Sequence, residues 1–257
     1  MITLKDLTEK VKKGISDYIG FDVQEIFDQS DYITIYGGAV RDSIAGMEIH
    51  DVDILCMSQS AEKLYKFLNK KYNFKRLDLY DLDTLNMYKG IRIISEPWTL
   101  MNDDKKIIQL IKPYYRKGLE TETLYIKAYT DLIKNVDISC CGVFLEDGID
   151  GILLKEACKY AIIHCLSKSF ELQKWSKLFN DERTLFREDK LIKRGWTNLN
   201  KLPNIFDNNK GIYQKRDRKL KLLELDFKPE YDFKIWTEDE YINREKCERE
   251  EPFPSWK

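Results

Sequence analysis

The stretch from Tyr36 to Met57 (YGGAVRDSIAGMEIHDVDILCM) constrains this chain more than any other part of its sequence. The β-branched and aromatic residues 32–36 (YITIY) predict a strand. Gly37-Gly38 then permit a sharp turn, because neither residue has a Cβ that would obstruct the backbone. Residues 39–45 suit one to two turns of helix, and Gly46 is a helix stop signal. The predicted order is strand, glycine turn and short helix.

The next part of this stretch carries two carboxylates. Asp51 and Asp53 lie in DVDILCM, a predicted second strand, where alternation sends both to one face while Val52 and Ile54 enter the core. Two carboxylates so placed can share hard divalent cations with substrate phosphates, as two-metal phosphoryl-transfer sites require. A glycine turn at a helix start offers free N–H groups to those phosphates. We therefore expect a site for two Mg²⁺ ions, or for Mn²⁺.

An Asp-x-Asp pair is weak evidence by itself. The chain has a second pair, Asp81 and Asp83, without a glycine turn before it, and a surface loop is the ordinary interpretation of such a pair. Asp51 and Asp53 differ from that pair because a predicted strand, a glycine turn and a short helix come before them in the sequence.

That order resembles the head-domain signature of the class II nucleotidyltransferases of the polymerase β-like superfamily, which includes CCA-adding enzymes and bacterial poly(A) polymerases. The family pattern is Gly-Gly-x-Val-Arg-Asp, a small helix ending in Gly, then Asp-x-Asp. It is matched at Gly37, Gly38, Val40, Arg41, Asp42, Gly46, Asp51 and Asp53. The resemblance implies that Asp51 and Asp53 are catalytic metal ligands. It also implies nucleotide binding by Gly37, Gly38, Arg41 and Asp42.

A second segment is similar to a family motif. Residues 136–144 (VDISCCGVF), inside a predicted strand over 135–145, resemble the family strand that begins Asp-Phe-Thr, although Ile138 and Ser139 occupy the Phe and Thr positions. The resemblance implies that Asp137 is a third catalytic and metal-binding carboxylate. Since an acidic residue is costly to bury without donors or a cation, a strand-end cap explains Asp137 equally well.

A basic stripe follows further along the chain. Its members recur at i, i+4, i+7 and i+11, which is one helical face: Arg183, Arg187, Lys190 and Arg194. The stretch is similar to the family's Arg-rich neck helix that ends in Gly-aromatic. Such a stripe can hold a triphosphate or an RNA backbone, or it can pair with Glu182 and Glu188 in water. We expect Arg183 and Arg187 to bind nucleotide.

The remaining patterns define the fold class. We expect an α/β (α+β) protein with a small mixed sheet of about five strands and packed helices. Further helices are expected over residues 4–19, 121–134 and 152–166 and around 61–68 and 218–225. The lysine face of the helix around 61–68 either meets solvent or contacts nucleic acid. Further strands are expected at 91–94 and 106–112. The expected domains are a nucleotidyltransferase head over 1–150 and a helical neck-like region with a charged tail over 151–257.

Composition limits the partners. Lys plus Arg (43) nearly equals Asp plus Glu (44) in these 257 residues, so a nucleic-acid site must be a local basic patch. There is no signal peptide and no apolar run approaching the roughly 18 residues of a membrane span, so we expect a cytoplasmic protein without membrane contact. The six cysteines lack a C-x-x-C pair and are expected to be reduced and buried.

The expected function is metal-dependent transfer of a nucleoside monophosphate from an NTP to an acceptor hydroxyl, foremost an RNA 3′ end, with release of pyrophosphate. A protein side chain or a small molecule remains open as the acceptor. The alternative is a non-catalytic module that binds nucleotide or RNA on the same head. Metal-dependent stabilisation by an NTP would distinguish the two.

Overall fold

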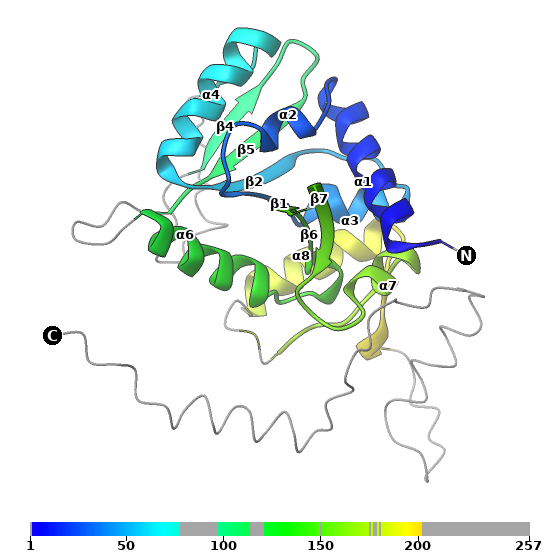
Figure 1. The fold of residues 1–257 in the computed structure, drawn as a ribbon. Helices are drawn as coiled ribbons and strands as arrows, with labels where there is room; N and C mark the ends of the chain where they lie inside the picture. The colour runs from blue at the N-terminus through cyan, green and yellow to red at the C-terminus, as the bar shows by residue number, and fades with distance from the viewer. Residues whose placement is uncertain are drawn as a thin grey trace, which may run out of the picture. The chain divides into compact units, whose positions relative to one another are not determined.

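Figure 1 shows the fold in a computed structural model of the chain. The structure describes residues 2–77, 97–113, 121–149, 151–174, 176, 179 and 181–201. The expected strand at 91–94, the expected helix around 218–225 and the second Asp-x-Asp pair at Asp81 and Asp83 lie outside the described residues.

The described residues form a seven-stranded mixed sheet in the order β3-β4-β5-β2-β1-β6-β7. Its strands are β1 (Ile33–Tyr36), β2 (Val52–Cys56), β3 (Lys75–Arg76), β4 (Trp98–Met101), β5 (Ile107–Ile111), β6 (Val143–Gly148) and β7 (Gly151–Glu156). β2 pairs with β5 in parallel, and the other neighbours are antiparallel. The predicted mixed α/β class is confirmed, with more strands than the expected five.

Two amphipathic helices form as their periodicity predicts. α1 (Leu4–Ile19) begins with a capping box in which Thr3 and Asp6 bond each other's backbone N–H groups, and its apolar residues are buried. α4 (Ser58–Tyr72) buries Ala61, Leu64 and Leu68. A single turn, α2 (Gln24–Phe27), lies between α1 and β1.

α4 and α6 (Thr121–Tyr129) cover opposite faces of the sheet (Figure 1). On one face Tyr65 of α4 contacts the ring of Trp98, which pairs with Leu110 of β5. On the other face Ile111 and Leu55 pack in one cluster with residues of α6. Because side chains alternate along a strand, Asp53 shares the α6 face with Leu55.

The strand expected over 135–145 is wrong in its first half. Residues Ser139–Cys141 form a 3-10 helix (η2), and β6 begins only at Val143. The reason is a competing partner: the backbone N–H of Ser139 donates to Glu171 O at 3.0 Å, and Ile138 bridges to Leu172. This part of the chain is therefore drawn away from the sheet.

The helix expected over 152–166 is also only half correct. Residues Gly151–Glu156 are β7, paired with β6, and only Ala161–Leu166 are helical (α7). Ile152 and Leu154 are buried while Leu153 between them is 39% exposed, which is strand alternation. The expected domain boundary after residue 150 consequently falls in the β6–β7 hairpin.

The remaining elements follow the sheet. α6 continues into a π-helical segment (η1, Thr130–Lys134), so the helix expected over 121–134 is present. α8 (Asp181–Lys193) is the expected basic helix, and β8 (Ser169–Phe170), β9 (Thr197–Asn198) and η3 (Leu199–Lys201) lie around it in sequence. No helix within the described ranges is long and apolar enough to span a bilayer.

Candidate active site

The predicted glycine turn forms between β1 and α3 (Gly38–Ala45). Gly37 is the N-cap of α3 with φ 72° and ψ −125°, a conformation that side chains disfavour. The Gly37 N–H donates to Val143 O at 3.2 Å and so ties the turn to β6. No side chain in the described part of the chain caps α3, and its first-turn N–H groups have no intrahelical partner. Gly37 and Gly38 are partly exposed, whereas Ala39 and Val40 are buried.

The two aspartates lie directly beside this turn. Asp53 pairs with Tyr36 across β1 and β2, and Asp51 precedes β2 by one residue. A Cβ on Gly37 would lie 3.8 Å from Asp53 Oδ2, and a Cβ on Gly38 would lie 3.8 Å from Asp51 Oδ1. The structure thus brings the glycine backbone and both carboxylates together.

Asp53 has an unmatched buried oxygen. Its Oδ1 atom is buried and has no hydrogen-bond partner among the described residues. Burial raises the pKa of Asp53 well above its usual range, and the negative charge of Asp51 raises it further, while Arg187 and Arg41 oppose this. A carboxylate pair with an unmatched oxygen fits a divalent cation, which would supply the missing partner and neutralise the repulsion.

No group of three or more histidine, cysteine, aspartate or glutamate side chains comes together as a metal site in the ranges that the structure describes. Asp51 and Asp53 are therefore the acidic part of any such site here. Further ligands must come from other oxygen atoms or from a substrate.

Arg41 and Asp42 are engaged with each other. Arg41 Nε donates to Asp42 Oδ1 at 2.8 Å, and its Nη2 donates to Asp42 Oδ2 at 3.0 Å. Arg194, just beyond α8, also donates to Asp42 Oδ2 at 2.9 Å. Asp42 is only 2% exposed, so Arg41 and Arg194 together compensate the buried charge of its carboxylate. Both residues brace α3 against the end of α8.

Asp137 meets the two predicted arginines. Its carboxylate, 1% exposed, accepts from Thr184 Oγ1 at 2.8 Å and from Arg187 Nη1 at 2.5 Å, with Arg183 Nη2 3.9 Å away. It lies before η2 and not at the start of a strand. Asp137 therefore anchors α8. Of the basic stripe, Arg183 and Arg187 face Asp137 and Arg194 faces Asp42, whereas Lys190 is exposed.

Two features of the site escape the sequence patterns. Cys141 accepts from Arg41 Nη1 at 3.4 Å, and its pKa is lowered to about 5 by a hydrogen bond from Cys140 and by the charges of Arg187 and Arg41. The second feature is Gln109 of β5, which pairs with Asp53 in the parallel register. Gln109 belongs to no motif, and the motif-like segment 136–144 gives Cys141 no role, so neither residue could be assigned to the site from the sequence.

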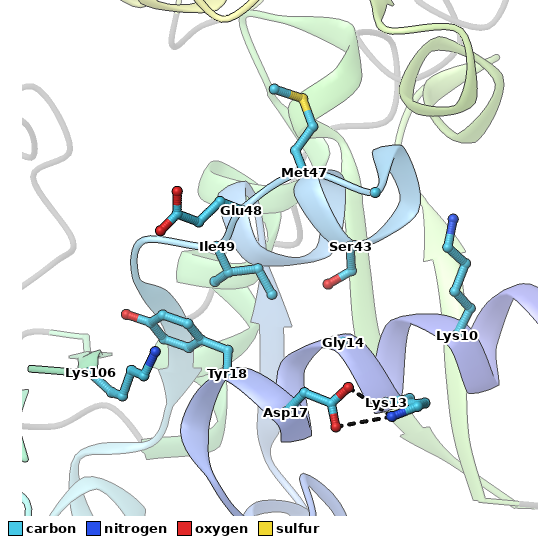
Figure 2. A pocket seen from close by; sticks show the side chains of 11 residues that line it. Lys10, Lys13, Gly14, Asp17, Tyr18, Ser43, Met47, Glu48, Ile49 and Lys106 are labelled. Atoms are coloured by element: carbon cyan, nitrogen blue, oxygen red, sulfur yellow. Dashed lines mark hydrogen bonds and ion pairs between the residues drawn. The ribbon is translucent and has the colours of Figure 1, made fainter. Parts of the chain in front are cut away.

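The loop between α3 and Asp51 is held from two sides. Arg194 Nη2 donates to Glu48 O at 2.9 Å, and the Tyr18 hydroxyl of α1 donates to His50 O. A pocket of about 380 Å³ lies between α1 and this loop. In Figure 2 it is bordered by Tyr18 and Gly14 of α1 and by Ser43 and Ile49, while Asp17 pairs with Lys13. None of the predicted site residues lines it, so this pocket is distinct from the aspartate site.

The sheet, with the glycine turn and the paired aspartates beside it, is a fold that this chain shares with solved CCA-adding enzymes. Among solved structures, it is similar to a CCA-adding enzyme in complex with CTP, with 14% sequence identity and a TM-score of 0.52 over 95% of this chain and 48% of that chain. It is also similar to an apo form of a CCA-adding enzyme, with 13% identity and a TM-score of 0.50 over 87% and 48%.

The chain spans less than half the length of these solved structures. No family model matches the sequence, and no curated protein matches it. At these identities the likeness establishes the fold, and the chemistry has to be argued from the site.

Proposed function

We propose that this protein is a metal-dependent nucleotidyltransferase that transfers a nucleoside monophosphate from an NTP to an acceptor hydroxyl and releases pyrophosphate. The observation that carries the proposal is the position of the Asp51 and Asp53 carboxylates beside the glycine turn, where a Cβ on Gly38 or Gly37 would meet them, together with the unmatched Oδ1 of Asp53. A phosphate-sized ligand on the turn would lie against the carboxylates, which is what phosphoryl transfer needs.

Each part of the site has a proposed task. Asp51 and Asp53 would hold Mg²⁺, two ions in the complete complex, with Mn²⁺ as a substitute. When bound, the metal supplies charge neutralisation at the phosphates and lowers the pKa of the attacking hydroxyl. Gly37 and Gly38 let the triphosphate approach the backbone, and the first-turn N–H groups of α3 donate to it. Such chemistry consists mainly of positioning and electrostatics.

The outer residues support this arrangement. Arg41 and Asp42 fix α3, and Arg183 and Arg187 would offset the charge of the bound nucleotide from α8. Asp137, the predicted third carboxylate, stays a prediction, because its oxygens accept from Thr184 and Arg187. The division into a head over 1–150 and a neck-like region over 151–257, and the cytoplasmic location, also stay predictions.

We propose an RNA 3′ end as the acceptor. Support comes from the likeness in fold to a CCA-adding enzyme solved with CTP. Because this chain spans less than half of that protein, which NTP is used and which RNA is extended have to be measured.

The test is transfer of label from each α-³²P-NTP, with Mg²⁺ or Mn²⁺, to total RNA and to cell extract. We expect label in RNA, and at least a 100-fold loss in Asp51→Asn and Asp53→Asn, since each removes a metal-binding charge. Asp104→Asn is the matched control, because Asp104 is an exposed turn residue. Wild-type rates in Asp51→Asn would contradict the assignment.

Two other outcomes would change the proposed function. Label in protein or in a small molecule would keep the chemistry and change the acceptor. NTP binding without any transfer would favour the alternative, a non-catalytic module that binds nucleotide or RNA on this head.

A further inference from the structure

A second unmatched oxygen lies next to that of Asp53. Gln109 in β5 pairs with Asp53 in β2, and because these two strands are parallel and in register, both side chains lie on the same face of the sheet. Gln109 is 9% exposed, and its Oε1 atom, like Asp53 Oδ1, is buried without a hydrogen-bond partner among the described residues. Neighbouring strands are about 4.8 Å apart, so the two residues lie side by side across β2 and β5.

Two buried acceptors side by side are an unusual arrangement. Buried polar atoms in folded proteins are nearly all hydrogen-bonded, because leaving one unpaired costs free energy. When Asp53 is ionised and the Gln109 amide is oriented as in the structure, Asp53 Oδ1 and Gln109 Oε1 cannot satisfy each other, since both accept and neither donates. A cation or a donor from outside the chain is therefore needed to satisfy the pair.

The charge around the pair favours a cation. Asp51 adds a second carboxylate beside the same glycine turn. Carboxylate and amide oxygens are both ligands of Mg²⁺ and Mn²⁺. The other nearby acidic residue, Asp137, has both oxygens committed to Thr184 and Arg187.

We propose that Gln109 is the third oxygen ligand of the divalent cation in the nucleotide-free protein, with its Oε1 joining Asp51 and Asp53. The inference rests on the proposed function, since it assumes that the aspartate pair binds metal. It adds a neutral ligand, so the protein alone offers two negative charges to the ion. A second ion then depends on the charge that the triphosphate brings.

Metal binding without nucleotide tests this directly. Mn²⁺ is titrated into the full-length protein, and free Mn²⁺ is measured by electron paramagnetic resonance. Gln109→Met keeps the length of the side chain and removes the oxygen, and we expect its Kd for Mn²⁺ to rise about tenfold. Gln109→Glu adds a charge at the same place, and we expect its Kd to fall about tenfold.

A matched control lies on the next strand. Thr99 of β4 pairs with Gln109 and is 6% exposed, so Thr99→Val alters the same face without touching Asp53. We expect its Kd for Mn²⁺ to equal that of the wild type. Thermal unfolding without metal checks the fold, and we expect Gln109→Met to unfold no earlier than the wild type, because an unmatched oxygen has been removed.

The failures can be told apart. If Asp51→Asn abolishes Mn²⁺ binding and both Gln109 variants bind as the wild type does, the Gln109 proposal is overturned and the aspartate site stands. A Gln109→Met variant that binds Mn²⁺ normally but raises the KM for NTP or acceptor also overturns it, in favour of a hydrogen bond to substrate. If Asp51→Asn leaves Mn²⁺ binding intact, the metal site of the proposed function fails.

Discussion

The guanidinium of Arg194 bridges Asp42 and Glu48, donating to Asp42 Oδ2 and to the carbonyl oxygen of Glu48 at 2.9 Å each. Its two partners lie in α3 and in the loop that leads to Asp51. One side chain from the end of α8 thus sets the distance between the glycine-turn helix and the first aspartate.

Removing this bridge should impair the site more than the fold. In Arg194→Met, Asp42 keeps Arg41 as its partner, so we expect a loss of about 1–3 kcal/mol in the free energy of unfolding. The loop before Asp51 loses one support, and we expect kcat for label transfer to fall about tenfold and the Kd for Mn²⁺ to rise. Lys193→Met is the matched control, because Lys193 forms an exposed pair with Asp189. Equal effects in both variants would refute the bridging role.

Arg187 and Asp137 should be coupled in stability. Arg187→Met leaves the Asp137 carboxylate, 1% exposed, with Thr184 as its close donor. We expect a cost of about 2–4 kcal/mol, below the upper end for buried pairs because the Arg187 side chain is 35% exposed. Asp137→Asn combined with Arg187→Met should cost less than the sum of the single changes, as urea unfolding of all four proteins would show. Additive costs would mean that the pair contributes nothing.

The two glycines of the turn should respond differently to alanine. Gly37→Ala places a Cβ at φ 72°, and we expect a loss of about 1–3 kcal/mol in unfolding free energy. Gly38→Ala meets only ordinary contacts, with Arg41 Nη2 at 3.7 Å and Asp51 Oδ1 at 3.8 Å. Its stability should change by less than about 0.5 kcal/mol, while the KM for NTP rises because the methyl group occupies the phosphate path. Unchanged NTP kinetics in Gly38→Ala would show that phosphates bind elsewhere.

Alkaline pH should destabilise the core under α6. Burial raises the pKa of Tyr125 to about 12 from an ordinary 10.0, although its hydrogen bond with Thr34 lowers it somewhat. A raised pKa means that the folded state holds the proton longer than the unfolded state, so stability is complete below pH 10 and falls between pH 10 and 12. The loss from this group is about 2–3 kcal/mol. The free energy of unfolding, measured with urea, should fall less steeply with pH in Tyr125→Phe than in the wild type. Equal slopes would contradict a raised pKa of Tyr125.

Local sequence patterns predicted the parts of the fold that depend on neighbours in sequence. The glycine turn and helix α1 are each specified within a few residues, and the structure confirms them and places Asp51 and Asp53 beside the turn. The sequence predicts helix where β7 forms, because the strand-like alternation at Ile152 and Leu154 is short and helix α7 follows soon after it. The apolar residues over 152–166 therefore fit a helical period as well as a strand period.

The rest of the site depends on contacts that sequence spacing does not contain. Arg194 and Asp42 are 152 residues apart, and Gln109 reaches Asp53 only because β5 is inserted beside β2 in parallel. The spacing of basic residues predicts the basic stripe but not what it faces. A helical period is the same whether the face meets solvent or a buried carboxylate such as Asp137.

The two-sided support of the loop before Asp51 has an entropic consequence. The carbonyl of Glu48 accepts from Arg194 and that of His50 from Tyr18, so this backbone loses its freedom when the chain folds. An incoming cation or nucleotide then finds Asp51 already ordered and does not have to immobilise it. Weakening either contact would transfer that ordering cost from folding to ligand binding.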